Sequence, residues 1–213
     1  MRLGVFIVCI CVSFAQAARA DDAPAPVAPP VSENPIVPGN QEKFDRAAAA
    51  FDAGNYEAAF KAFKKLANKG DLAAMRNVAL MERKGLGTDK DPEAAQDMYR
   101  FVASAGLPTA QYDLGEMLLH GEAGDPDAKA AARWFALAAM AHHPLAEYEL
   151  GKMYEDGVVL DKDLTRAETL YGDASSRGVW DATVRLAALK GEPPPKAPTQ
   201  PGLQPAEPVS QGQ

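Results

Sequence analysis

A unit of 36 residues recurs in register along this chain, and this repeat constrains the fold more than any other feature. The run Ala-Gln-Tyr-Asp-Leu-Gly-Glu-Met at 110–117 reappears as Ala-Glu-Tyr-Glu-Leu-Gly-Lys-Met at 146–153. Between the copies, Tyr99, Phe135 and Tyr171 keep the same period inside segments of helical composition. A single unit of this size cannot bury its apolar face alone. The sequence therefore predicts an all-α solenoid of helix–turn–helix units that stack around a continuous core.

We expect the solenoid to occupy residues 41–190, where apolar residues recur at helical spacing. An opening pair, Gln41–Ala53 and Tyr56–Lys69, is separated by a tight turn at Gly54-Asn55. The expected divisions are an opening pair at 41–70, repeats at 72–106, 108–142 and 144–178, and a capping helix at 180–190.

The two ends of the chain have a different composition. Residues 1–20 carry an apolar run from Leu3 to Phe14 followed by Ala18-Arg19-Ala20, which is typical of a secretory signal cleaved after Ala20. The alternative is an N-terminal membrane anchor, although the run is short for a bilayer. Residues 21–40 and 191–213 are rich in proline, which predicts a linker and a tail that remain unfolded.

Charge and cysteine content limit the possible partners. Cleavage would remove two of the 22 basic residues and none of the 29 acidic ones, which leaves a formal net charge of −9. It would also remove Cys9 and Cys11, so the mature chain would have no disulfide. An acidic chain without a basic cluster argues against nucleic acid and against a polybasic membrane patch. We expect a periplasmic or secreted protein that is not inserted in the membrane after cleavage.

The three longer turns share an Asp-x-Asp motif in register. Its second aspartates are Asp91, Asp127 and Asp163, each preceding an expected helix. An aspartate there can accept the free amide hydrogens of the first helical turn. Calcium binding is the alternative, but these loops lack the further oxygen ligands and the bidentate glutamate of a calcium loop. We therefore predict helix caps, with Pro92 and Pro126 at helix starts.

No arrangement of residues predicts catalysis, a metal or a cofactor. The three histidines, His120, His142 and His143, include no pair at a spacing of four. His142-His143-Pro144 is typical of a helix end, where a cation suits the dipole, with a metal site as the alternative. The segment at 85–87 reads as a turn, and no serine lies in a G-x-S-x-G motif. Trp134 is expected to stack between repeats.

With these residues in place, the chain resembles the Sel-1-like repeat family, which is related to tetratricopeptide repeats. The residues that carry the resemblance include Ala110, Leu114, Gly115, Gly121, Asp127, Ala131, Trp134 and Ala138, and again Ala146, Leu150, Gly151, Tyr154, Gly157, Asp163, Ala167 and Gly178. The repeat at 72–106 departs by having Val78-Ala79 for Leu-Gly. The resemblance implies a right-handed superhelix of antiparallel helix pairs that serves as a scaffold for protein contacts.

By the same resemblance, the first helix of each pair lines a concave groove. Its outward positions fall between the apolar ones, which is an independent but weaker argument. The candidate partner-binding residues are Arg76, Arg83, Tyr112, Glu116, His120, Tyr148, Lys152 and Glu155, accompanied by Leu80, Lys84, Leu119 and Asp156.

Three functions fit this organisation. The favoured one is a non-enzymatic adaptor of the bacterial envelope that holds a protein or peptide in the groove and regulates envelope signalling. A cell-wall or β-lactam-acting enzyme is the second, because a cysteine-rich branch of the family is described in those terms, but its regular cysteine pairs are missing here. The third is a structural array that associates through its open ends.

Overall fold

The computed structural model describes residues 39–193 and 195–196. The expected signal peptide at 1–20 lies outside the described residues, as do most of the proline-rich segments at 21–40 and 191–213. The described part forms nine α-helices and no strand: α1 (Gln41–Asp52), α2 (Tyr56–Ala67), α3 (Leu72–Lys84), α4 (Pro92–Ser104), α5 (Pro108–His120), α6 (Ala128–Met140), α7 (Pro144–Asp156), α8 (Leu164–Ser176) and α9 (Trp180–Leu189). Within these ranges, each helix is too short or too polar to cross a bilayer.

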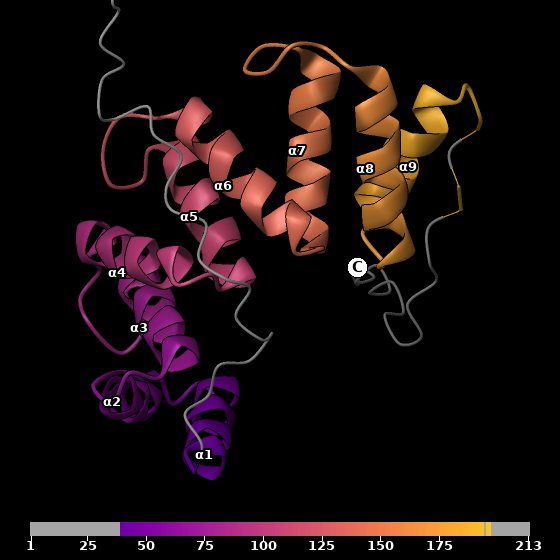
Figure 1. Ribbon diagram of the computed structural model, residues 1–213. Coiled ribbons are helices and arrows are strands. Elements are labelled where there is room, and N and C mark those ends of the chain that lie inside the picture. The colour runs from indigo at the N-terminus through magenta and orange to yellow at the C-terminus, as the bar shows by residue number, and fades with distance from the viewer. Residues whose placement is uncertain (1–38, 194, 197–213) are drawn as a thin grey trace, which may run out of the picture.

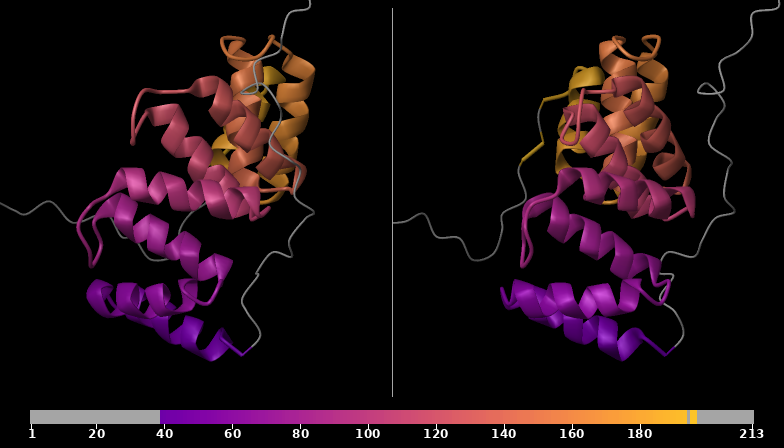
Figure 2. Two further views of the ribbon diagram at one scale, coloured as in Figure 1. Left: turned by 60° about the vertical axis from the view of Figure 1, so that its left-hand side comes forward. Right: turned by 90° about the vertical axis from the view of Figure 1, so that its left-hand side faces the viewer.

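The helices pack in the order in which they occur in the chain. Every extensive helix contact in the described part joins a helix to the next one along the sequence. Figure 1 shows the resulting succession of helical hairpins from α1 to α9, and Figure 2 shows α1–α2, α3–α4 and α5–α6 as stacked layers. This arrangement confirms the predicted all-α helical-repeat fold, in which each unit contacts only its neighbours.

The turns inside the three repeats have one shared construction. Each first helix ends at a glycine in the left-handed region, Gly85, Gly121 or Gly157, with φ of 70°, 64° and 72°. The turn is then closed by a backbone hydrogen bond from Asp91, Asp127 or Asp163 to the carbonyl nine residues earlier. The predicted helix caps are confirmed, since the same three aspartates accept backbone N–H groups at the starts of α4, α6 and α8.

One carboxylate of each Asp-x-Asp motif is therefore used in capping. The described residues contain no group of three or more His, Cys, Asp or Glu side chains that could hold a metal ion. Pro92 is the first residue of α4, as predicted. The prediction for Pro126 is wrong by two residues, because α6 begins at Ala128 after the cap Asp127.

The turns between repeats also follow one pattern. Gly106 and Gly178 have φ of 92° and 91°, and His142 takes the equivalent place with φ of 59°. His143 then precedes α7 and caps it, because its Nδ1 accepts the Ala146 N–H at 3.4 Å. Burial lowers the pKa of His143 despite the nearby Asp113 carboxylate, which favours the neutral acceptor. The predicted cation at a helix end is therefore wrong for His143, which lies at the positive end of α7.

The core of each repeat is centred on one aromatic residue. Tyr99, Phe135 and Tyr171 are all fully buried. In two repeats the ring lies against a glycine of the first helix: a Cβ at Gly115 would lie 2.6 Å from Phe135, and one at Gly151 would lie 2.8 Å from Tyr171. The close approach of the paired helices thus depends on those glycines.

The residue before each central aromatic connects its repeat to the preceding one. Met98 packs against the core that contains Phe63, Trp134 against the core that contains Tyr99, and Leu170 against the core that contains Phe135. The prediction that Trp134 stacks between repeats is confirmed. This periodic contact explains why neighbouring units share buried surface.

Candidate functional site

The eight candidate partner-binding residues lie on three helices that alternate with the second helices of the pairs. Arg76 and Arg83 are on α3, and Tyr112, Glu116 and His120 are on α5. The other three, Tyr148, Lys152 and Glu155, are on α7. We call the surface formed by the outward side chains of these helices the α3–α5–α7 face. None of the eight is fully buried, but their contacts divide them into three groups.

The first group forms ties between repeats. The Arg76 Nε donates to Asp113 Oδ2 at 2.6 Å, and Asp113 is only 6% exposed. Arg83 forms a bidentate pair with Glu122, which follows α5, and this pair lowers the pKa of the Glu122 carboxyl. Paired charges that are partly shielded from water interact more strongly than exposed ones. The two arginines therefore hold α3 to the following repeat.

Glu155 belongs to the same group. Its Oε2 accepts a hydrogen bond from the Tyr171 hydroxyl at 2.6 Å and another from Arg185 Nη1 at 2.8 Å. Burial opposes ionisation of Glu155, but these two donors outweigh it and the pKa is lowered. The carboxylate therefore joins α7 to α8 and α9.

The tyrosines of the face pack on the central aromatics. The Tyr112 ring lies 5.8 Å from the Phe135 ring and is stacked on His143 at 4.9 Å. The Tyr148 ring lies 5.9 Å from the Tyr171 ring, and the Lys152 ammonium lies 5.2 Å above Tyr148. Such ring contacts add to the energy of burial. Both tyrosines therefore support the core while remaining partly exposed.

The remaining three are Glu116, His120 and Lys152, of which Lys152 lines a hollow between α5 and the end of α7. This groove has a volume of about 160 Å³ and is lined by Leu119, Glu149, Lys152, Met153, Asp156, Val158 and Val159. Val158 is 87% exposed, which is unusual for a large aliphatic side chain beside a hollow. Sequence reasoning found Leu119, Lys152 and Asp156 but missed Val158 and Val159, which lie in the turn after α7.

The charges beside this groove are incompletely balanced. Lys152 Nζ donates to Glu149 at 2.7 Å, whereas the contact between Glu116 and His120 is long, at 3.9 Å. Burial and the repulsion of Glu149 raise the pKa of Glu116. A cationic group from a partner would relieve this repulsion, so the groove combines apolar walls with an acidic rim.

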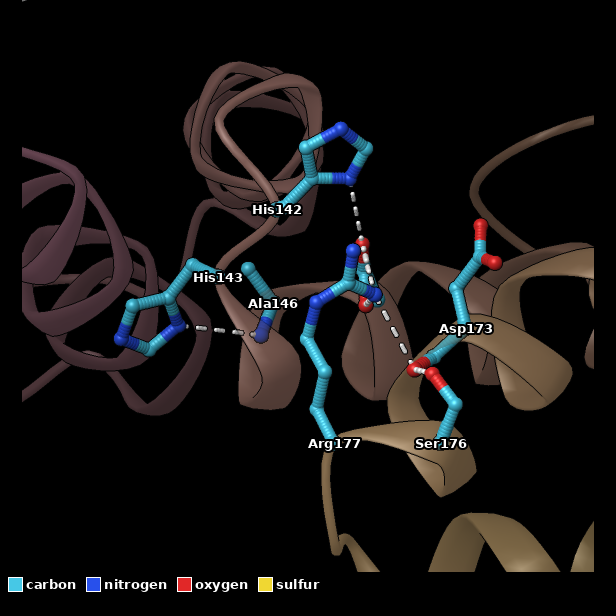
Figure 3. A network of polar contacts seen from close by, with 7 residues as sticks. His142, His143, Ala146, Asp173, Ser176 and Arg177 are labelled. Carbon is cyan, nitrogen blue, oxygen red and sulfur yellow. Dashed lines mark hydrogen bonds and ion pairs between the residues drawn. The ribbon is translucent and has the colours of Figure 1, made fainter.

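A buried glutamate forms a further polar cluster that the sequence analysis did not single out. Glu147 on α7 is 1% exposed and contacts His142 Nδ1 at 3.3 Å and Arg177 Nη1 at 3.1 Å. Arg177 also donates to the Asp173 carbonyl, so the turns before α7 and before α9 meet here (Figure 3). The equivalent residue one repeat earlier is Gln111. A charged residue at a position of the repeat that is buried could have indicated this cluster from the sequence.

We expect Glu147 to make stability depend on pH. Burial raises its pKa above the ordinary value of 4.5, although His142 and Arg177 oppose that change. A carboxyl with a raised folded-state pKa contributes stability that is fully present below its unfolded pKa and lost as pH rises through its folded pKa. In urea titrations from about pH 4 to about pH 7, the protein should lose stability relative to Glu147→Gln. A difference that is constant across this range would contradict the prediction.

The fold and this face define a class: a helical-repeat protein with an extended surface for contacts. Three consecutive stretches, 72–107, 108–143 and 144–179, match the model of the Sel1 repeat, and the chain belongs to the Sel1 repeat family. Sel1 repeats generally form helical scaffolds for protein–protein contacts. No curated protein matches the chain.

Two solved structures share the fold. A Sel1 repeat protein from Oxalobacter formigenes is 30% identical with a TM-score of 0.65, over 68% of this chain and 59% of that one. The protein c5321, described as a protective antigen of uropathogenic Escherichia coli strains with an SLR fold, is 23% identical with a TM-score of 0.65 over 72% of this chain and 34% of that one. The chain therefore spans about three fifths and one third of these two relatives.

Proposed function

We propose that this protein is a non-enzymatic adaptor that binds a protein or peptide on the α3–α5–α7 face. The single observation that carries the proposal is the groove beside Leu119, Lys152 and the exposed Val158. An apolar side chain of a partner would enter the groove, and a lysine or arginine of the same partner would lie near Glu116 and Glu149. A hollow with apolar walls and a few polar groups is the usual form of a recognition pocket.

We further propose that the protein acts in the periplasm or outside the cell and contributes to envelope signalling. The support is the secretory pattern of residues 1–20, which is a sequence argument alone. N-terminal sequencing of the protein recovered from the periplasm or medium should begin at Asp21. Recovery only with an intact Met1, in the membrane fraction, would favour the anchor alternative.

Groove binding is best tested by site-specific photo-crosslinking. Tyr112 and Tyr148 are poor sites for substitution, because both pack on buried rings and their loss would disturb the fold. A photoreactive phenylalanine analogue at Val158 should capture a partner in envelope extract, whereas the same group at Leu164, which is 47% exposed, should not. Adding Glu149→Lys should reduce the capture at position 158, because it replaces a carboxylate that the partner's cation would contact with a like charge. Identical products from positions 158 and 164 would overturn the assignment of the face.

A further inference from the structure

The structure gathers basic residues at the end of the solenoid formed by α1 and α2. Five of them lie on these two helices and one in the turn that follows α2: Lys43, Arg46, Lys61, Lys64 and Lys65, and then Lys69. Residues 41–69 contain these six basic residues and four acidic ones, whereas residues 70–190 contain 13 basic and 20 acidic ones. The expectation that the chain has no basic cluster is therefore wrong for this end. We call these six side chains the α1–α2 basic ridge.

Two grooves flank this ridge. One, of about 390 Å³, lies between the two helices and is lined by Lys43, Arg46, Ala58, Lys61, Ala62, Lys65, Leu66 and Lys69. The other, of about 440 Å³, lies on the opposite side of α2 and is lined by Glu57, Phe60, Lys61, Lys64, Lys65, Asn68 and Gly87. Lys61 and Lys65 border both grooves. The apolar floor of each is thus enclosed by ammonium groups.

Much of the positive charge of the ridge is available to a partner. Arg46 pairs with Glu42 and Lys61 with Glu57, but these pairs are highly exposed and such pairs contribute little. Lys64 lies 5.1 Å above the Phe60 ring. Lys43, Lys65 and Lys69 have no ion pair within the described residues. Several cations of the ridge therefore have no strong internal contact that an anionic partner would have to break.

We propose that the α1–α2 basic ridge binds an acidic amphipathic segment of a partner protein, whose apolar side chains enter the two grooves and whose carboxylates contact the lysines. The argument is charge complementarity combined with the recessed apolar floors. Lys61 and Lys65 are spaced by four on one side of α2, and Lys69 follows in the turn after the helix, so the cations can match carboxylates at helical spacing. This surface is separate from the α3–α5–α7 face and does not depend on its function.

Two other anionic partners fit these observations less well. A membrane would favour protruding apolar side chains, but Phe60 and Leu66 are only 9% and 2% exposed. Single-stranded nucleic acid would favour exposed rings for stacking, and the one ring lining these grooves, Phe60, lies beneath Lys64. The acidic remainder of the described chain would also repel an extended phosphate backbone. A short peptide can use the ridge without approaching that remainder.

The test is a fluorescence-anisotropy titration with a labelled helical peptide that presents leucines flanked by glutamates. We expect saturable binding that weakens as ionic strength rises from about 0.05 to about 0.5 M. Binding should fall about tenfold in the variant Lys65→Glu/Lys69→Glu, because two attractive contacts become repulsive. The matched control is Lys129→Glu/Arg133→Glu, an exposed pair at the same spacing on α6, which should bind as the parent does.

Three results would overturn the proposal. The first is an equal loss of peptide binding in the ridge variant and in the α6 control variant. The second is equal binding of the original peptide and of one in which every glutamate is replaced by glutamine. The third is no binding of the peptide to the parent protein. Vesicles of anionic phospholipid and a single-stranded oligonucleotide are titrated in parallel, and binding of either without the peptide would assign the ridge to that partner instead. Circular dichroism of both variants shows that they remain folded. Failure here leaves crosslinking at Val158 unaffected.

Discussion

Replacing Phe135 with alanine is expected to destabilise the protein by about 3–5 kcal/mol, the usual cost of removing a fully buried phenylalanine. The Phe135 ring is 0% exposed and fills the space between Gly115 and Tyr112. The paired helices are held close at Gly115, so they cannot move together further to fill the cavity. Loss of the ring would also weaken the contact that Leu170 makes with this core. Urea unfolding followed by circular dichroism measures the effect.

The matched control for this change is Met140→Ala on the same helix. Met140 is 76% exposed, so its truncation should change the free energy of unfolding by less than about 0.5 kcal/mol. If the two variants unfold at similar urea concentrations, Phe135 does not have the central packing role assigned to it.

Replacing Gly87 with alanine is expected to cost about 2–3 kcal/mol, because two separate effects act at this position. Its φ is 69°, which alanine adopts only with strain. A Cβ there would also lie 2.3 Å from the backbone of Tyr56 at the start of α2, and backbone cannot move aside as a side-chain tip can. The predicted turn at 85–87 thus also positions the first repeat against the opening pair.

The control for Gly87 is Gly124→Ala in the equivalent turn of the next repeat. Gly124 has no positive φ, and a Cβ there would meet no atom within 4 Å. Thermal unfolding should show a clear loss of stability for Gly87→Ala and little change for Gly124→Ala.

Since Gly87 also lines one groove beside the α1–α2 basic ridge, Gly87→Ala should weaken peptide binding as well. Comparable unfolding of both variants would contradict the close contact with Tyr56.

The sequence was a good guide wherever a residue type repeats with the 36-residue period. Tyr99, Phe135 and Tyr171 recur, and so do the glycines and aspartates of the turns, because the two helices of every unit pack on each other and on the next unit in the same way. His142 departs from the pattern at a position where the family usually has glycine, and its φ of 59° shows that it adopts the same left-handed turn. Periodicity did not reveal that the adjacent His143 caps α7.

The candidate site was less accessible to sequence reasoning, because its contacts join residues that do not repeat. Arg76 meets Asp113 across 37 positions, and the residue 36 positions after Arg76 is Tyr112. Periodicity identifies which positions point outward, but it does not reveal which outward charges neutralise one another. Glu155 was also selected because its position points outward, but in the structure its carboxylate accepts hydrogen bonds from Tyr171 and Arg185.

The sequence by itself determined the helix pairs, their caps and the residues that fill each core, because these depend on local spacing and on a repeated burial pattern. The tertiary structure alone decided which charges are paired, where an aliphatic groove opens beside Val158, and that the lysines of α2 lie beside Lys43 and Arg46. The physical reason is the antiparallel packing of helices, which brings together residues far apart in the chain. Their distances, and hence their electrostatic interactions, are fixed only when the helices pack.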